Sequence, residues 1–185
     1  MNRYHRRCCS SDGWAETVEE TILPLVLDGL DLGDDVLELG PGYGATTRPL
    51  AARLPRLTAA ELDPELAAGL RADLAGRVEV VEADARALPF PDGRFSAVLC
   101  FTMLHHVESP AAQDEVFREV RRVLRPGGVF AGADSRTSLR FRLIHLFDTI
   151  VPIDPATLPA RLEAAGFAEP DVTANERRLR FAARA

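Results

Sequence analysis

The chain has 185 residues, of which 46% are hydrophobic and 27% are charged, and these proportions are typical of a globular domain. The length predicts a single domain over residues 1–185, and the net charge of −6 argues against a nucleic-acid partner. No apolar run reaches the roughly 18 residues that a membrane-spanning helix needs, and no signal-peptide core follows the basic N-terminus, so we expect a cytoplasmic protein without a membrane span.

The cysteines show no pattern typical of a metal site or a disulfide framework. Cys8 and Cys9 are adjacent, and Cys100 lies in an apolar stretch where a small buried thiol is expected. A cysteine–histidine metal site needs more ligands at better spacing. We therefore expect no metal.

The first expected element is an amphipathic helix. Apolar residues recur at helical spacing from Trp14 to Val26, and Pro24 is expected to kink or end this helix. Residues 1–30 then have two interpretations, a helix packed on the core or a flap that folds over a site.

A glycine loop follows a short apolar strand expected at residues 36–39. Gly40, Gly42 and Gly44 alternate through this turn. Glycine lets the backbone approach a ligand closely, and the helix expected at residues 45–54 starts with unpaired N–H groups. Because ligands of open α/β sheets bind at the carboxyl ends of strands, this loop is the first candidate binding site.

The elements that follow alternate between strands and helices. We expect further strands at residues 57–62, 77–81, 95–101, 129–133, 167–173 and 178–183. We expect helices at residues 64–75, 110–124 and 156–165, with a less regular helical candidate within 136–153. Asp63 and Pro64 suit the N-cap and the first position of a helix. This alternation predicts an α/β fold with a doubly wound sheet covered on both faces.

Three motifs resemble the class I S-adenosylmethionine-dependent methyltransferases. They are V-L-E-L-G-P-G-Y-G at residues 36–44, L-H-H-V at 104–107, and R-P-G-G at 125–128. From about Val36 onward the chain is similar to the small-molecule branch of that family, the methyltransferase type 11 or ubiquinone–menaquinone biosynthesis-like proteins. The resemblance implies a Rossmann-like, mostly parallel sheet with an antiparallel last strand and the strand order 3-2-1-4-5-7-6.

The resemblance also implies S-adenosylmethionine as the cofactor and assigns residues to it. The implied cofactor-binding residues are Glu38, Gly40, Pro41, Gly42, Gly44, Glu61, Leu62, Asp84, Ala85 and Phe101. Glu38 would balance the amino group of the cofactor, and Glu61 would accept hydrogen bonds from its ribose hydroxyls. Asp84 would accept one from the adenine amino group. Each acid has a plainer alternative: Glu61 as a solvated charge at a strand end, and Asp84 as the cap of a short turn.

The acceptor side is expected around His105 and His106. In the family that the chain resembles, this loop borders the transferred methyl group. A histidine there can act as a general base. The alternatives are that the pair only lines the site, or that one histidine is buried scaffold. Residues 136–153 are the candidate substrate lid, with His145 and Asp148 as possible acceptor contacts, although a core-packing helix would show the same pattern.

The expected reaction is in-line transfer of a methyl group to a small-molecule acceptor. Gly40, Gly42 and Ala45 also fit a dinucleotide fingerprint, so a nicotinamide-dependent oxidoreductase remains an alternative. The sequence departs from the family at Ser96, where most relatives carry Asp or Asn. The side chain at that position often supports the start of a strand. Because the usual Asp or Asn is absent here, a non-catalytic cofactor-binding protein is the third interpretation.

Overall fold

A computed structural model describes residues 2–146 and 148–185, and within them one sheet of seven strands forms the centre of the fold. The strands are β1 Val36–Leu39, β2 Leu57–Glu61, β3 Glu79–Glu82, β4 Phe95–Phe101, β5 Leu124–Ser135, β6 Ala168–Ala174 and β7 Arg178–Arg184. Their order is β3-β2-β1-β4-β5-β7-β6. Strands β1 to β5 run parallel, and β7 is antiparallel to β5 and β6. The predicted fold class and strand order are confirmed.

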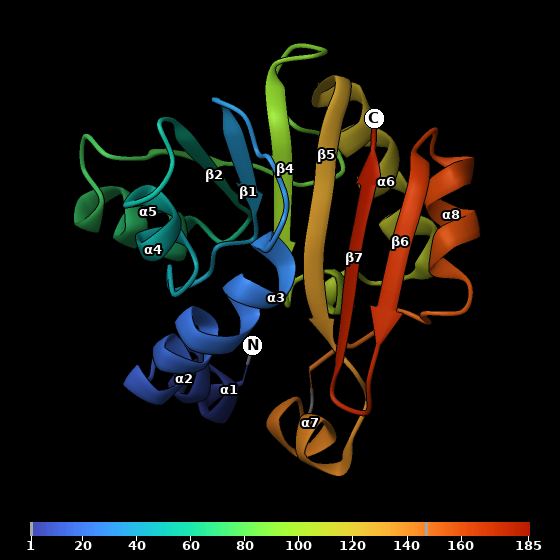
Figure 1. Cartoon of the computed structure of the whole chain (residues 1–185). Coiled ribbons are helices and arrows are strands. Elements are labelled where there is room, and N and C mark those ends of the chain that lie inside the picture. Colours follow the sequence, from blue (N-terminus) through green and yellow to red (C-terminus); the bar gives the residue numbers. More distant parts are fainter. Residues whose placement is uncertain (1, 147) are drawn as a thin grey trace.

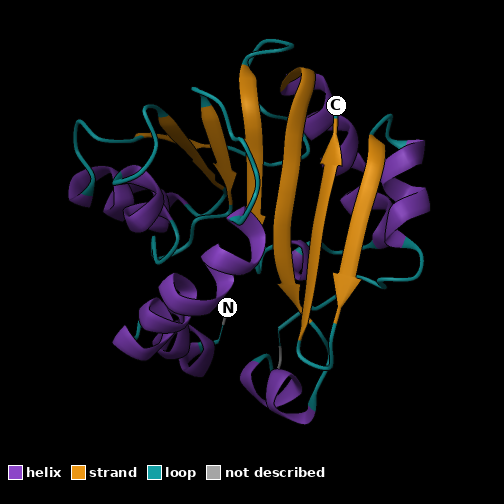
Figure 2. Cartoon of the chain, in the orientation of Figure 1, coloured by secondary structure: helices purple, strands orange, loops and turns teal. Residues whose placement is uncertain are grey.

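Helices cover both faces of this sheet (Figure 2). The helical segments are α1 Arg3–Cys9, α2 Asp12–Thr17, the π-helix η1 Val18–Ile22, α3 Leu23–Leu27, α4 Thr47–Ala51, α5 Pro64–Asp73, the 3-10 helix η2 Leu104–His106, α6 Pro110–Val123, α7 Leu139–Ile144 and α8 Leu158–Ala164. The side chain of Asp63 caps α5 as predicted, because it accepts hydrogen bonds from the backbone N–H groups of Glu65 and Leu66. Among the described residues, no helix has the length and apolar character to cross a bilayer.

Two apolar clusters form the core, one on each face of the sheet. Alternate residues of a strand point to opposite faces, so Leu37 of β1 joins the cluster under α6 and α8. Its neighbour Val36 joins the cluster under η1, α3 and α5. Burial on both faces explains why apolar residues occupy both faces of the central strands.

The N-terminal helix continues past Pro24, but its α-helical hydrogen bonding is interrupted just before that residue. Because proline has no N–H group, it cannot continue the hydrogen-bond ladder. The chain adopts a π-turn over η1, in which the N–H of Leu23 donates to the carbonyl of Val18, and α3 then continues to Leu27. The expected kink therefore takes the form of a π-segment.

Ser96 supports the loop that enters β1. Its hydroxyl oxygen accepts a hydrogen bond from the N–H of Asp35 at 2.9 Å, and the hydroxyl lies 2.7 Å from the carbonyl oxygen of Leu32, to which it can donate. Gly33 packs against it, since a Cβ at Gly33 would lie 2.6 Å from the Cβ of Ser96. A small hydroxyl side chain thus supports the strand start, where larger Asp or Asn side chains were expected.

Two of the boundaries that differ from the sequence-based prediction lie in β5 and in the expected lid. Strand β5 begins at Leu124, directly after α6, and residues 125–128 form an irregular stretch within it, since Phe95 pairs with Leu124 but Ala97 pairs with Val129. The helix in the expected lid is shorter than its apolar pattern and covers only Leu139–Ile144. Phe147, part of that pattern, lies outside the described residues.

Three helices gather beyond the carboxyl ends of the parallel strands (Figure 1). Helices α1 and α2 lie on one side of this end of the sheet, and α7 lies below the ends of β5 and β6. Asn2 joins the two sides, because its side-chain amide donates to the carbonyl oxygens of Ile144 and Leu146 at 2.8 and 2.9 Å. The N-terminal segment and the expected lid are therefore in direct contact.

Candidate cofactor and acceptor site

A cavity of about 2180 Å³ opens at the carboxyl ends of the strands, between them and α1, α2 and α7. It exceeds the roughly 300–1,000 Å³ of a typical single-ligand pocket, so it has room for two ligands. The predicted residues that line it are Gly40, Pro41, Gly42, Glu61, Leu62, Asp84, Ala85, Phe101, His105 and His106. Glu38 and Gly44 lie behind its surface, which places them in supporting positions.

The glycine loop after β1 has a left-handed backbone at each of its three glycines. Gly42 has a φ of 56°, and a Cβ there would meet nothing within 4 Å, so its backbone is open to a ligand. Gly40 packs against the next loop, since its Cβ would lie 2.3 Å from Cγ of Met103. Gly44 faces α5, where its Cβ would lie 2.5 Å from Leu70. Gly44 thus packs against a helix, whereas the sequence placed it at the cofactor.

Glu61 fixes this loop to the end of β2. It is buried, and its two carboxylate oxygens accept backbone N–H groups, Oε2 from Gly42 and Oε1 from Asp63, at 2.9 and 3.0 Å. Each oxygen retains a second lone pair, and the side chain lines the cavity. The carboxylate can therefore hold the loop and still accept hydrogen bonds from a ligand.

Glu38 is a buried acid with one oxygen unused. The hydroxyl of Thr46 donates to its Oε1, while its Oε2 has no hydrogen bond of good geometry among the described residues. The hydroxyl of Thr47, which is also buried and unpaired, lies near enough to lower the pKa of Glu38. Burial is the main cause that raises the pKa of Glu38 to about 7, and the nearby Glu61 raises it further. An unsatisfied buried acceptor of this kind fits a ligand that brings a positively charged amino group.

Asp84 caps a short turn and also lies at the cavity wall. Its carboxylate accepts the backbone N–H of Arg86 at 2.9 Å, which is the turn cap, and it lines the cavity. The guanidinium of Arg86 also pairs with it at 2.6 Å and lowers its pKa. Nearby, Leu62 has 64% of its surface exposed, as a side chain that covers a flat ligand ring would before binding.

All four histidines of the chain meet at the other end of the cavity. His105 is buried, and its Nδ1 lies 2.5 Å from Oδ1 of Asp134. Its Nε2 lies 3.2 Å from Nε2 of His145, and the ring of His106 packs beside both. Burial lowers the pKa of His106 to about 2, so this ring is neutral near pH 7.

Two residues of this group were missed by sequence reasoning. His5 stacks on His106 with a centroid separation of 5.1 Å, and its Nδ1 lies 3.0 Å from Oδ2 of Asp148. The flap interpretation of residues 1–30 places this segment over a site, but nothing in the local sequence singles out His5. Asp134 did leave a signal, because an acid near the carboxyl end of a parallel strand is a candidate site residue.

The methyltransferase domain family matches residues 37–132, just over half of the chain. The chain belongs to this family. This membership confirms the predicted family and enzyme class, and S-adenosylmethionine as the cofactor. The dinucleotide interpretation of the glycine loop thereby loses its support.

The curated relatives of this methyltransferase name two kinds of acceptor. It is 37% identical to a ribosomal RNA small subunit methyltransferase A of Bordetella pertussis, over 72% of this chain and 56% of that protein. It is 36% identical to a ubiquinone/menaquinone biosynthesis C-methyltransferase of Pseudomonas putida, over 55% of this chain and 42% of that one. The chain thus spans just over half the length of the RNA methyltransferase it matches.

These relatives overturn one expectation. A small-molecule acceptor without a nucleic-acid partner was predicted, and several relatives carry the name of ribosomal RNA methyltransferases at 30–37% identity. The prediction was wrong because it used the charge of the whole chain. Binding to RNA depends on the charge near the contact surface.

A solved structure agrees with the fold. A SAM-dependent methyltransferase from Aquifex aeolicus superimposes with a TM-score of 0.76, over the whole of this chain and 98% of that one. At 17% sequence identity, the likeness concerns the fold alone.

Glu38 should make stability depend on pH. Its pKa is raised in the folded state, so its contribution is fully present below about pH 4.5 and is lost as the pH rises through about 7. We expect wild-type protein to lose about 3 kcal/mol more than Glu38→Gln between pH 4.5 and 8, measured by urea unfolding. Equal losses in the two proteins would show that Glu38 is ionised normally.

Proposed function

We propose that this chain binds S-adenosylmethionine along the glycine loop and transfers its methyl group to an acceptor held beside the four histidines. The observation that carries the proposal is the pair of buried acids around the loop, Glu38 with an unused oxygen and Glu61 at the cavity wall. Both fit the polar groups of this cofactor, which supplies an activated methyl group on a sulfonium.

The residues at the strand ends would divide the cofactor among them. Glu38, which lies just behind the cavity surface, would balance the amino group directly or through water. The backbone at Gly40 and Gly42 would lie along the methionine portion, Glu61 would accept from the ribose hydroxyls, and Asp84 would accept from the adenine amino group. Such positioning alone can lower a transfer barrier by roughly 7–11 kcal/mol.

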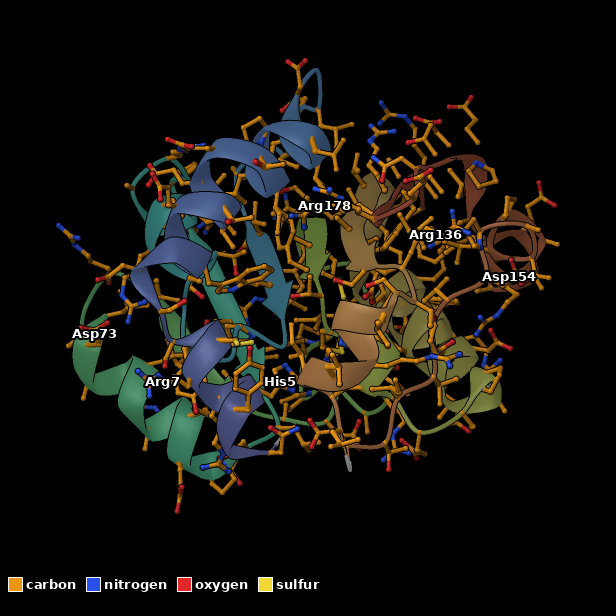
Figure 3. The ribbon with its side chains drawn as sticks, turned by 90° about the horizontal axis from the view of Figure 1, so that it is seen from below. His5, Arg7, Asp73, Arg136, Asp154 and Arg178 are labelled. Carbon is orange, nitrogen blue, oxygen red and sulfur yellow. The ribbon has the colours of Figure 1, made fainter. Side chains whose placement is uncertain are left out.

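The far wall of the cavity supports an acceptor with negative charge. Arg136, Arg177 and Arg178 line it, and among the described residues no acid pairs with them (Arg136 and Arg178 are labelled in Figure 3). Burial and the neighbouring Arg177 lower the pKa of Arg178, so an anion there would be stabilising. With the names of the RNA-methylating relatives, this makes ribosomal RNA the first acceptor to test.

The cofactor site is tested by Glu61→Ala. We expect the dissociation constant of S-adenosylhomocysteine to rise at least tenfold, about 1.4 kcal/mol, in isothermal titration calorimetry. Glu82→Ala is the matched control, because Glu82 pairs in register with Glu61 on the next strand and is exposed. Equal affinities for the two variants would remove Glu61 from the site, and circular dichroism would verify that both are folded.

The acceptor side is tested by methyl transfer from labelled S-adenosylmethionine to small-subunit ribosomal RNA. We expect the double variant Arg177→Ala/Arg178→Ala to lose about tenfold in rate, as removal of two phosphate contacts would produce, with unchanged cofactor affinity. Arg118→Ala, an exposed arginine on α6, is the control and should keep its activity. No label on the RNA would contradict this acceptor, and equal rates would contradict the arginine contact.

A further inference from the structure

Three segments distant in sequence bring four imidazoles together. We call His5, His105, His106 and His145 the histidine cluster. His5 comes from α1, His105 and His106 from η2, and His145 follows α7 directly. Seen from the carboxyl ends of the strands, His5 lies between α1 and α7 (Figure 3). Three of the rings are buried and the fourth, His106, is half-buried.

Hydrogen bonds at Nδ1 leave Nε2 as the free nitrogen of three of the four rings, His5, His105 and His145. Nδ1 of His145 donates to the carbonyl of Phe141 at 2.8 Å, and a carbonyl can only accept. Nδ1 of His5 and of His105 face the carboxylates of Asp148 and Asp134 in the same way. Neutral rings held like this turn the lone pair of Nε2 inward. Metal-binding histidines have this outer contact to a carboxylate or a backbone carbonyl.

The Nε2 atoms of His105 and His145 are close enough to share a proton or a metal ion. Nε2 of His105 and Nε2 of His145 lie 3.2 Å apart, and two facing lone pairs at that distance repel unless a proton or a metal ion lies between them. Two nitrogens bound to one tetrahedral zinc ion at about 2.0–2.1 Å are roughly 3.3 Å apart. The ligand atoms of His5, His106 and His145 all lie within 4.8 Å of one another.

We propose that the histidine cluster binds one divalent transition-metal ion, with Zn²⁺ as the best match. His5, His106 and His145 would be its ligands. Imidazole nitrogens suit Zn²⁺, whereas Mg²⁺ and Ca²⁺ require oxygen ligands. This proposal replaces the sequence-based expectation of no metal, which considered only cysteine–histidine spacing.

The bound ion would hold the cover of the cavity closed. Its ligands connect α1 and the end of α7 to η2, which follows β4 at the floor of the site. Asn2 already contacts the carbonyls of Ile144 and Leu146 across the same junction. The inference goes beyond the proposed methyl transfer, because metal binding requires neither cofactor nor acceptor.

The test is metal titration of protein that carries no polyhistidine tag and has been treated with a chelator. We expect one Co²⁺ per chain with visible absorption bands of a tetrahedral site, displacement by Zn²⁺, and no binding of Mg²⁺. His106→Ala is the main variant, because His106 is half-buried and its loss disturbs the fold least. It should weaken Zn²⁺ binding by about 100-fold, and His145→Ala should do the same.

The matched control is Cys8→Ser/Cys9→Ser, since both cysteines line the same cavity and thiolates also bind zinc. This variant should bind Zn²⁺ as the wild type does. A second measurement is hydrogen exchange, in which Zn²⁺ should slow exchange of α1 and α7. The proposal is overturned if Zn²⁺ does not bind, if His106→Ala binds it equally, or if the cysteine variant loses it. A proton shared by His105 and His145 would give the first of these results.

Discussion

The carboxylate of Glu61 is the contact on which the site depends. It accepts backbone N–H groups from Gly42 and Asp63, and so ties the loop after β1 to the start of α5. With the loop fixed, Glu38 lies behind it with an unused oxygen. The two strand ends thus form one polar surface, and the parallel sheet fixes their spacing through the pairing of β1 with β2.

The second half of the site depends on the segments that cover it. A parallel sheet leaves the carboxyl ends of its strands open, and here α1, α2 and α7 lie beyond them. Their side chains meet the loop after β4 through histidines and through Phe141 of α7, whose ring packs against His105. Leu139 and Leu143 of α7 remain exposed, so Phe141 provides the buried apolar contact of α7, and the polar contacts of Asn2 add to it. Segments held in this way open at low cost in free energy, as entry of an acceptor into the cavity requires.

The sequence predicted the strands and helices because those features are local. The N-cap at Asp63 and the position of Glu61 at a strand end follow from spacing along the chain, whereas the strand order came from the family resemblance. The role of Gly44 did not follow from spacing, because its contact with Leu70 appears only when α5 packs on the loop. His5 was missed because the fold of the N-terminal segment over the site is a long-range property. The net charge of −6 was a poor guide to a nucleic-acid partner, because it does not report where charges lie. Three arginines line one wall of the cavity.

The most direct test of the account is thermal unfolding of the chain with S-adenosylmethionine, S-adenosylhomocysteine, NAD and NADP in parallel. A ligand at about 100 times its dissociation constant stabilises the folded state by roughly 2.7 kcal/mol. The account predicts a rise in the melting temperature with the two sulfur nucleosides and none with the nicotinamide dinucleotides. A rise with NAD or NADP alone would contradict it, because the glycine loop would then be a dinucleotide site.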